Sequence, residues 1–308
     1  MSTKEALEQR IHTERSAVLI VNTHSRRGER LFRAALDALQ RRGLSINASY
    51  PVGNPVRLPD TVREAIARGT PLVIVGGGDG TISSVVDYFA DQDVVLGILP
   101  LGTGNSFART LGIPLSLDGA IDVVVDGKLV DVDLGMVGTD YFANVATIGF
   151  SAEVVRRASR RLKRYLGVFA YALAGVEILF SHRSFLCRMA VGDNIEVVRT
   201  HQVIIANGSF YGLRRLTAEA GADNRQLTVF TMADLNRWQM LKVWIDVLRG
   251  KRAAPAMARY LTTPELSIDT EPQQPIDVDG ELITHTPARF RVAPEALKVM
   301  APRTFKDE

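Results

Sequence analysis

The sequence predicts an α/β fold followed by a β-rich one: an N-terminal α/β domain with a parallel sheet, then a C-terminal domain of antiparallel β-strands. Up to about residue 130, short apolar runs alternate with helical patterns, as in a parallel sheet covered by helices on both faces. Beyond that point, short strands follow one another with few helical patterns between them. The length of 308 residues exceeds what one hydrophobic core usually serves, so we expect two domains that meet near Gly135.

The spacing of apolar residues justifies each N-terminal element. The run AVLIVN is short and ends in a polar residue, which is typical of a buried strand, whereas Leu31, Ala35 and Leu39 recur about one helical turn apart. The same criteria apply along the chain. They predict strands at 17–22, 71–75 and 94–99 and helices at 29–41, 61–68 and 81–90.

The C-terminal elements are mostly short strands bounded by polar and turn-forming residues. Two longer helical patterns interrupt them. We predict strands at 130–134, 141–148, 185–191, 202–206, 227–231 and 265–269, and helical regions at 151–180 and near 235–248.

Composition excludes several classes of protein. Cys187 is the single cysteine, which excludes an intramolecular disulfide and a thiolate zinc site and fits a reducing compartment. A net charge of +3 is too small to indicate a nucleic-acid partner. Residues 1–15 lack the apolar core of a secretory signal, and the apolar stretch at 165–180 is short for a membrane span and contains Glu177. We therefore expect a cytoplasmic protein without a transmembrane helix.

The strongest local signal is a glycine loop, GGGDGT at 76–81, between a predicted strand and a predicted helix. Consecutive glycines bring backbone N–H groups close to phosphate oxygens, and a helix N-terminus adds a favourable dipole. The carboxylate of Asp79 would repel phosphate unless Mg²⁺ or a proton to be abstracted lies between them. The alternative is a plain strand-to-helix turn. The loop is neither a Walker A loop nor a dinucleotide fingerprint.

A second glycine loop, PLGTGNSFAR at 100–109, follows the next predicted strand. Ligands of open parallel sheets bind outside the carboxyl ends of the strands, so two glycine loops there can line one crevice. Taken alone, this loop could equally be an ordinary turn. Together the two loops predict a phosphate-binding site at this edge of the sheet.

At these motifs the chain resembles the diacylglycerol kinase catalytic family, which includes sphingosine and ceramide kinases and many bacterial lipid kinases. The resemblance covers nearly the whole chain. It implies an N-terminal ATP-binding domain at 1–134, to which the last strand near 297–300 and residues 295–308 return, and a β-rich lipid-substrate domain at 135–294. It also implies an ATP- and Mg²⁺-dependent reaction in the cleft between them. The further matching motifs are NTHSRRG at 22–28, DVDLG at 131–135, ANVATIG at 143–149, NG at 207–208 and DVDGE at 277–281.

The resemblance also implies roles for individual residues. Asp79 would act in catalysis through Mg²⁺ or the acceptor hydroxyl, Glu281 is the second acidic candidate, and Asp133 would join a magnesium-linked carboxylate network. A lipid hydroxyl is a poor nucleophile, so a carboxylate base and neutralisation of the phosphoryl oxygens are the expected contributions. The residues expected to contact the nucleotide are Asn22, Ser25, Gly77, Gly78, Gly80, Thr81, Gly102, Thr103 and Asn105.

Two of the acidic positions have structural alternatives. The pair Asp279-Gly280 is a strong hairpin signal, so Glu281 could simply follow a turn. Asp131 and Asp133 alternate along a predicted strand and could face solvent.

The chain also departs from the family pattern. Ser84 and Ser106 stand where many members carry acids, although the sphingosine kinases also lack the second, and Arg26 replaces a glycine in the first loop. The segment 218–227 lacks the usual Asp-Gly, so we assign no structural metal there.

A basic cluster precedes the apolar stretch at 166–179. Basic side chains near anionic lipids contribute roughly 1 kcal/mol each, which would permit peripheral docking at the inner membrane surface. The alternative is a solvated helix face beside an apolar run that covers the sheet. The cluster consists of Arg156, Arg157, Arg160, Arg161, Lys163 and Arg164.

These features predict an ATP-dependent lipid kinase acting on a hydroxyl of diacylglycerol or a related lipid. One alternative is a kinase with a soluble acceptor, such as an NAD kinase or a phosphofructokinase-like sugar kinase, which resemble only the first glycine loop. Another is a non-catalytic protein that binds lipid or nucleotide. The acceptor lipid is not readable from the sequence, and the oligomeric state stays open, with a homodimer among the alternatives.

Overall fold

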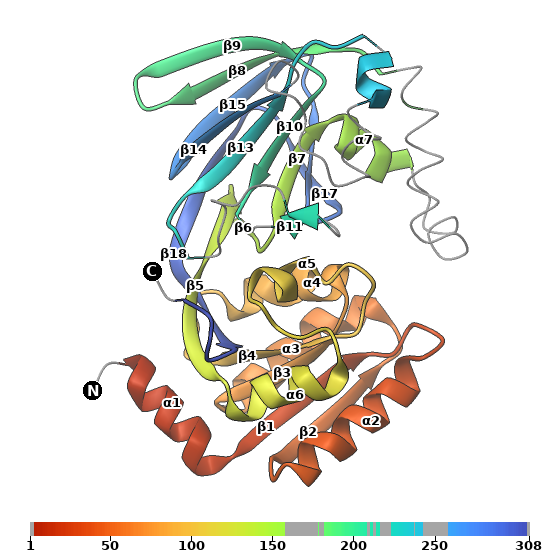
Figure 1. The fold of residues 1–308 in the computed structure, drawn as a ribbon, viewed down its shortest axis with the longest axis vertical. Helices are drawn as coiled ribbons and strands as arrows, with labels where there is room; N and C mark the ends of the chain where they lie inside the picture. The colour runs from red at the N-terminus through yellow and green to blue at the C-terminus, as the bar shows by residue number, and fades with distance from the viewer. Residues whose placement is uncertain are drawn as a thin grey trace. The chain divides into compact units, whose positions relative to one another are not determined.

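The computed structural model describes residues 3–157, 178, 182–207, 210–211, 214–215, 223–236, 238–242 and 258–306. These residues divide into two compact units (Figure 1). The N-terminal unit comprises the residues up to Leu134, the short segment 223–224 and the residues from Ala293 onward. The C-terminal unit comprises the other described residues between Gly135 and Val292.

A parallel sheet forms the centre of the N-terminal unit, with its strands in the order β2-β1-β3-β4-β18. Strands β1, β3 and β4 are buried along almost their whole lengths, which explains why each reads as one continuous apolar run. Strand β18 completes the sheet through Val299, which pairs in parallel with Leu96. The bounds are β1 (Ser16–Asn22), β2 (Ser45–Val52), β3 (Leu72–Gly77), β4 (Val95–Pro100) and β18 (Ala288–Ala301).

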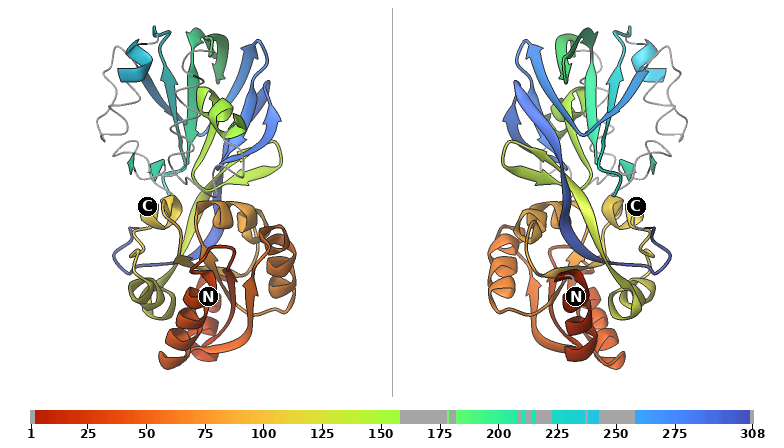
Figure 2. Two further views of the ribbon diagram at one scale, coloured as in Figure 1. Left: turned by 90° about the vertical axis from the view of Figure 1, so that its right-hand side faces the viewer. Right: turned by 90° about the vertical axis from the view of Figure 1, so that its left-hand side faces the viewer.

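Helices cover both faces of this sheet (Figure 2). Helix α2 packs against α6, and α3 packs against α4. The apolar spacing seen in the sequence explains the packing, because α2 buries Phe32, Ala35 and Leu39 on one face. The bounds are α1 (Thr3–Glu14), α2 (Gly28–Arg41), η1 (Pro55–Arg57), α3 (Leu58–Ala67), α4 (Asp79–Phe89), α5 (Ser106–Thr110) and α6 (Leu117–Asp126).

Two antiparallel sheets pack face to face in the C-terminal unit. One has the order β14-β13-β10-β7-β16-β17, and the other contains β18-β15-β8-β9, with β5 and β6 paired beside it. Buried side chains from both sheets form a shared core, among them Ile148 and Val203 from the first and Ile268 and Phe290 from the second. Cys187 lies in this core, and burial raises the pKa of its thiol to about 12, so the thiol stays protonated.

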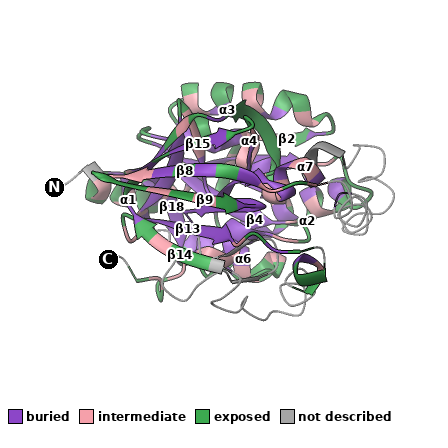
Figure 3. Ribbon diagram, turned by 90° about the horizontal axis from the view of Figure 1, so that it is seen from above, coloured by how far each residue is buried: buried purple, intermediate pink, exposed green. Residues whose placement is uncertain are grey.

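The edge strands β9 and β14 expose most of their described residues (Figure 3). An ion pair between Arg259 of β14 and Glu196 of β9 links these edges. The bounds in the unit are β5 (Lys128–Val137), β6 (Asp140–Phe142), β7 (Val145–Gly149), α7 (Phe150–Arg157), β8 (Phe185–Val191), β9 (Asn194–Thr200), β10 (Gln202–Ala206), β11 (Phe210–Tyr211), β12 (Arg214–Arg215), β13 (Leu227–Met232), β14 (Ala258–Thr263), β15 (Glu265–Glu271), β16 (Pro275–Val278) and β17 (Glu281–His285).

The predicted fold class is confirmed: the first unit is α/β with a parallel sheet, and the second is built from antiparallel sheets. One predicted strand is wrong in part. The strand expected at 141–148 is two strands, β6 and β7, because the chain leaves the ladder at Ala143 and Asn144.

Two helical predictions fall partly outside the described residues. The region predicted at 151–180 is described only at 151–157 and 178, and the region near 235–248 is helical at 238–242 and not described beyond. In the part of the chain that the structure describes, no helix is long and apolar enough to cross a membrane. The apolar stretch at 165–180 lies outside that part, apart from residue 178.

Candidate functional site

The two glycine loops touch each other at the carboxyl ends of β3 and β4. The Leu101 N–H donates a hydrogen bond of 2.8 Å to the Gly77 carbonyl oxygen. A Cβ added at Gly102 would lie 2.4 Å from the Gly78 Cα, which is closer than any side-chain carbon can approach. The contact between the loops therefore requires glycine, because only a residue without Cβ lets the two backbones meet.

Asp79 connects the two loops through its carboxylate. It is the first residue of α4 and is half-buried. Its Oδ1 accepts a hydrogen bond from the Ser106 N–H, and its Oδ2 lies so close to Gly104 that a Cβ there would be 2.3 Å away. One carboxylate oxygen is thus fixed by the second loop while the other lies over that loop's backbone.

Asn105 holds the second loop in shape. It adopts a left-handed conformation with φ of 52° and ψ of 48°, and it is buried. Its Oδ1 accepts a 3.0 Å hydrogen bond from the Gly102 N–H, and its Nδ2 donates a 2.9 Å bond to the Gly102 carbonyl oxygen. Gly102 and Thr103 are left exposed. Asn105, expected to contact nucleotide, therefore has its amide occupied within the loop.

Asn22, at the end of β1, is bound to the first glycine loop. Its Nδ2 donates a 2.9 Å hydrogen bond to Thr81 Oγ1, and its Oδ1 accepts from the His24 N–H at 3.1 Å. Thr81 is buried and packs so closely on Gly77 that a Cβ at Gly77 would lie 2.4 Å from the Thr81 Cβ. Ser25 is exposed on the loop after β1. The structure thus brings Asn22, Gly77 and Thr81 together at the same edge of the sheet.

The N-terminus of α4 gives this edge its electrostatic character. Gly78 is the N-cap residue, and Gly80 is exposed in the first turn of the helix. The unpaired N–H groups of a helix N-terminus favour anions. An exposed glycine backbone beside one carboxylate fits a phosphate together with a divalent cation.

Asp133 is separated from solvent. It lies in β5, is 1% exposed, and its Oδ1 accepts a 3.0 Å hydrogen bond from the Glu295 N–H. Glu295 has a left-handed φ of 53°, so the carboxylate supports an unusual turn of β18. The interpretation that Asp133 faces solvent is wrong. Its neighbour Asp131 pairs with Lys4 at 3.2 Å.

In the C-terminal unit, Asp279 and Gly280 form the hairpin turn between β16 and β17, with φ of 47° and 97°. Glu281 follows the turn as the first residue of β17 and is exposed. The Asp279 carboxylate binds the loop between β6 and β7, where it accepts hydrogen bonds from the Ala143, Asn144 and Val145 N–H groups at 3.0, 3.3 and 2.9 Å. These bonds join the sequences DVDGE and ANVATIG, which are far apart in the chain.

The comparisons with known proteins agree with this arrangement. The model of the diacylglycerol kinase catalytic domain matches residues 16–137, and the model of the YegS C-terminal NAD kinase beta sandwich-like domain matches residues 144–301. The chain belongs to the diacylglycerol kinase family. The predicted resemblance is thereby confirmed.

Relatives and solved structures extend the match over most of the chain. A Chromohalobacter salexigens protein named probable lipid kinase YegS-like is 31% identical over 264 residues, or 84% of each chain. A Staphylococcus epidermidis diacylglycerol kinase is 29% identical over 240 residues, or 77% of this chain and 76% of the relative. The crystal structure of a Bacillus anthracis diacylglycerol kinase shares the fold, with a TM-score of 0.74, 19% identity, and coverage of 95% of this chain and 98% of that one.

Two contacts at the glycine loops were not predicted from the sequence. Ser106 stands in the sequence only as the replacement of an acid, yet its backbone N–H fixes Asp79. Arg109 donates from Nε to the Gly104 carbonyl oxygen at 2.8 Å and so holds the second loop. A backbone donor carries no sequence signal, whereas Arg109 lies within the matched sequence PLGTGNSFAR.

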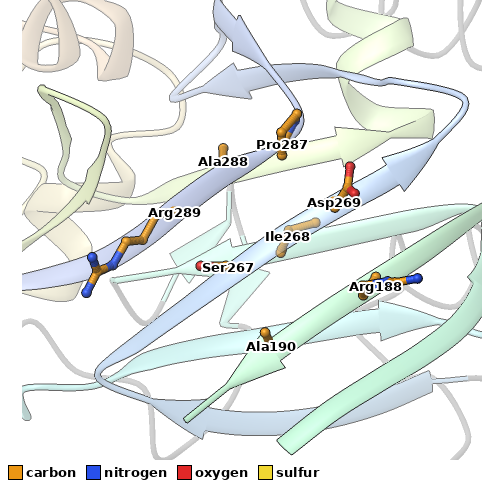
Figure 4. A pocket seen from close by; sticks show the side chains of 8 residues that line it. All are labelled: Arg188, Ala190, Ser267, Ile268, Asp269, Pro287, Ala288 and Arg289. Atoms are coloured by element: carbon orange, nitrogen blue, oxygen red, sulfur yellow. The ribbon is translucent and has the colours of Figure 1, made fainter. Parts of the chain in front are cut away.

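A pocket of about 310 Å³ lies in the C-terminal unit, on the outer face of β8, β15 and β18 (Figure 4). Arg188, Asp269 and Arg289 are among its lining residues, and Arg289 is paired with Glu265. It contains none of the predicted site residues.

Asp279 is expected to make the stability of the protein depend on pH. Burial raises the pKa of its carboxyl from 3.8 to about 6, although three backbone donors favour the carboxylate. Because the pKa is higher in the folded than in the unfolded chain, this residue stabilises the fold most below pH 4 and loses that contribution as the pH rises through about 6. We expect the difference in unfolding free energy between wild type and Asp279→Asn to fall by up to about 3 kcal/mol between pH 4 and 7.

Urea unfolding at several pH values measures this difference. Asp193→Asn, which changes an exposed carboxylate in the turn between β8 and β9, is the matched control and should show no such trend. A difference that grows as the pH rises would contradict the expectation, since it would mean that the three hydrogen bonds outweigh burial.

Proposed function

We propose that this protein is an ATP-dependent lipid kinase, which transfers the γ-phosphoryl group of ATP to a hydroxyl of diacylglycerol or a related lipid. The observation that carries the proposal is the position of Asp79. Its carboxylate is held between two glycine loops at the N-terminus of α4, where phosphate groups are favoured. The family assignment and the printed names of the relatives support the same chemistry.

The proposed roles follow from the contacts. The exposed backbone of Gly80, Gly102 and Thr103 binds phosphate oxygens, while Asn22 and Thr81 hold the first loop against β1. Asp79 takes the proton of the acceptor hydroxyl or binds the metal ion, and Glu281 is the second acid. Ser25 and the remaining loop glycines, Gly77 and Gly78, complete the proposed nucleotide contacts.

The residues at this edge of the sheet would supply few ligands of their own to a magnesium ion. The described part of the chain holds no cluster of three or more potential metal ligands. Asp79 Oδ2 is the carboxylate oxygen available beside the glycine loops, so the ion would be bound mainly through phosphate oxygens, as is common for Mg²⁺. Mg²⁺, when bound, would neutralise charge on the phosphoryl oxygens. Asp133 would act at a distance, by fixing the turn at Glu295.

The test is transfer of labelled γ-phosphate from ATP, with and without Mg²⁺, to diacylglycerol, ceramide and sphingosine in mixed micelles. NAD and fructose 6-phosphate serve as soluble acceptors in parallel. We expect label in the lipid phase only when Mg²⁺ is present. Label in a soluble acceptor would overturn the lipid proposal. ATP binding without transfer to any acceptor would favour a non-catalytic member, in line with the replacement of two acids by Ser84 and Ser106.

A further inference from the structure

Trp238 is displayed to solvent in a way that needs explanation. Its exposed fraction is 79%, the highest among the large apolar side chains that the structure describes. Tryptophan usually covers its ring and finds a partner for its N–H, and it is enriched where a protein meets another surface. A tryptophan left in water is therefore a candidate contact residue.

The backbone around Trp238 is held firmly rather than loosely. The Asn236 N–H donates to Gln239 Oε1, and the Gln239 N–H donates to Asn236 Oδ1, each at 3.0 Å. This reciprocal pair is a capping box at the start of a helical turn. The Met240 N–H continues the helix with a 2.9 Å bond to the Asn236 carbonyl oxygen. The exposure of Trp238 is thus built into a fixed turn.

Apolar residues on either side anchor the same turn to the C-terminal unit. Leu235 precedes the N-cap and Met240 follows four residues after it, and both are buried in one cluster with Phe150 and Val154 of α7. Such a contact across an N-cap is a hydrophobic staple. Because the staple takes Leu235 and Met240 inward, Trp238 points away from the cluster.

Lys242 lies one helical turn after Trp238 and is also exposed. Residues four apart share a helix face, so the indole ring and the ammonium group are neighbours on the surface. No salt bridge or hydrogen bond engages the Lys242 side chain among the described residues. An aromatic ring beside a cation matches the boundary of a bilayer, where tryptophan lies at headgroup level and lysine meets anionic lipid.

The composition of this face favours a membrane over a protein partner. The exposed neighbours Asn236 and Gln239 are polar, so among the residues that the structure describes at this turn Trp238 is the single exposed apolar one. A stable protein interface buries about 800 Å² on each partner, with several apolar residues at its core. A membrane can accept one aromatic anchor supported by charge.

We propose that Trp238 and Lys242 bind this protein to the surface of a bilayer that contains anionic lipid. The proposal rests on the proposed function, since a lipid acceptor dissolved in a membrane has to be reached from its surface. It does not use the basic cluster at 156–164, of which only Arg156 and Arg157 lie within the described residues, at the end of α7.

Sedimentation with vesicles, in the absence of ATP, tests the proposed membrane contact. Vesicles of phosphatidylcholine alone and of phosphatidylcholine with phosphatidylglycerol are compared for wild type, Trp238→Ala and Lys242→Gln. We expect Trp238→Ala to lower vesicle affinity at least tenfold and Lys242→Gln to lower it about fivefold on anionic vesicles only. Val56→Ala, which removes an apolar side chain 76% exposed in the N-terminal unit, should change nothing. Unchanged affinity of Trp238→Ala, or no vesicle binding by wild type, would overturn the proposal.

A second measurement distinguishes a loss of membrane contact from a loss of kinase function and from damage to the fold. Phosphorylation of a short-chain diacylglycerol dispersed as monomers should be equal in wild type and Trp238→Ala, whereas phosphorylation of a long-chain lipid in vesicles should fall with vesicle affinity. An equal loss of phosphorylation on both substrates would overturn the proposed membrane contact, because it would indicate a damaged fold. A change of oligomeric state in Trp238→Ala would overturn it in favour of a second copy of the chain. Vesicle binding that depends on Trp238, in a protein without any kinase activity, would support the proposed membrane contact and reject the proposed lipid kinase function.

Discussion

Replacing Asp79 with asparagine is expected to lower the rate of phosphoryl transfer by about 10²–10⁴-fold, the usual range for a positioned acid or base. Asparagine keeps the oxygen that accepts the Ser106 N–H, so the contact between the two loops survives. The lost charge is the one that lies over Gly104 beside the glycine backbone. We therefore expect the maximal rate to fall while the affinity for ATP stays within a few fold.

Steady-state kinetics and direct titration of ATP binding measure the two quantities separately. The matched control is Asp87→Asn, which neutralises an exposed carboxylate two turns further along α4. It should leave both the rate and the affinity unchanged. If Asp79→Asn kept its rate within about threefold, the catalytic carboxylate of the proposed reaction would have to belong to another residue, with Glu281 the first to consider.

Gly102→Ala is expected to weaken nucleotide binding strongly, because the added methyl group would strike the backbone of the other glycine loop. The new Cβ would lie 2.4 Å from the Gly78 Cα and 2.9 Å from Asn105 Oδ1, so the two loops must move apart. A displacement of about 1 Å at such a site can cost about 100-fold in activity. We expect ATP affinity to fall by at least tenfold and the free energy of unfolding by about 1–3 kcal/mol.

Titration calorimetry and urea unfolding check these two values. Gly53→Ala is the control, because a Cβ there would make only an ordinary contact of 3.8 Å with Thr23 Oγ1. The expectation fails if Gly102→Ala binds ATP as tightly as the control variant does.

The buried strands were the most predictable part of the fold. Each of β1, β3 and β4 is covered on both faces, so its sequence is apolar throughout and cannot be mistaken for a loop. Strand β2 escaped prediction because it is an edge strand with a single buried residue, Val52, and its sequence SINASYPV shows no apolar pattern. Helix α1 escaped because only Leu7 and Ile11 of its residues are buried apolar ones.

The site was predictable where it depends on local backbone geometry. The glycines of the first loop indicate a close approach of the backbone, and a Cβ at Gly77 would indeed lie 2.4 Å from the Thr81 Cβ, although one at Gly80 would meet nothing within 4 Å. Contacts between distant residues left no such signal. The bond from Glu295 to Asp133 and the bonds from the β6–β7 loop to Asp279 join residues more than 130 positions apart. Spacing along the chain carries no information about such pairs, although the family resemblance marked Asp133 and the sequence around Asp279.

Strand β18 has a consequence for biosynthesis. It pairs with β4 through Val299, which is synthesised about 200 residues after Leu96 of β4. Until then the backbone of β4 presents an open strand edge, which is the kind of surface on which nascent chains aggregate. The same strand pairs with β15 through residues from Ala288 to Arg291, so its synthesis closes a sheet in each unit. Strand β18 therefore joins the sheet late, and we expect the N-terminal α/β unit to reach its full sheet only after Val299 has been translated.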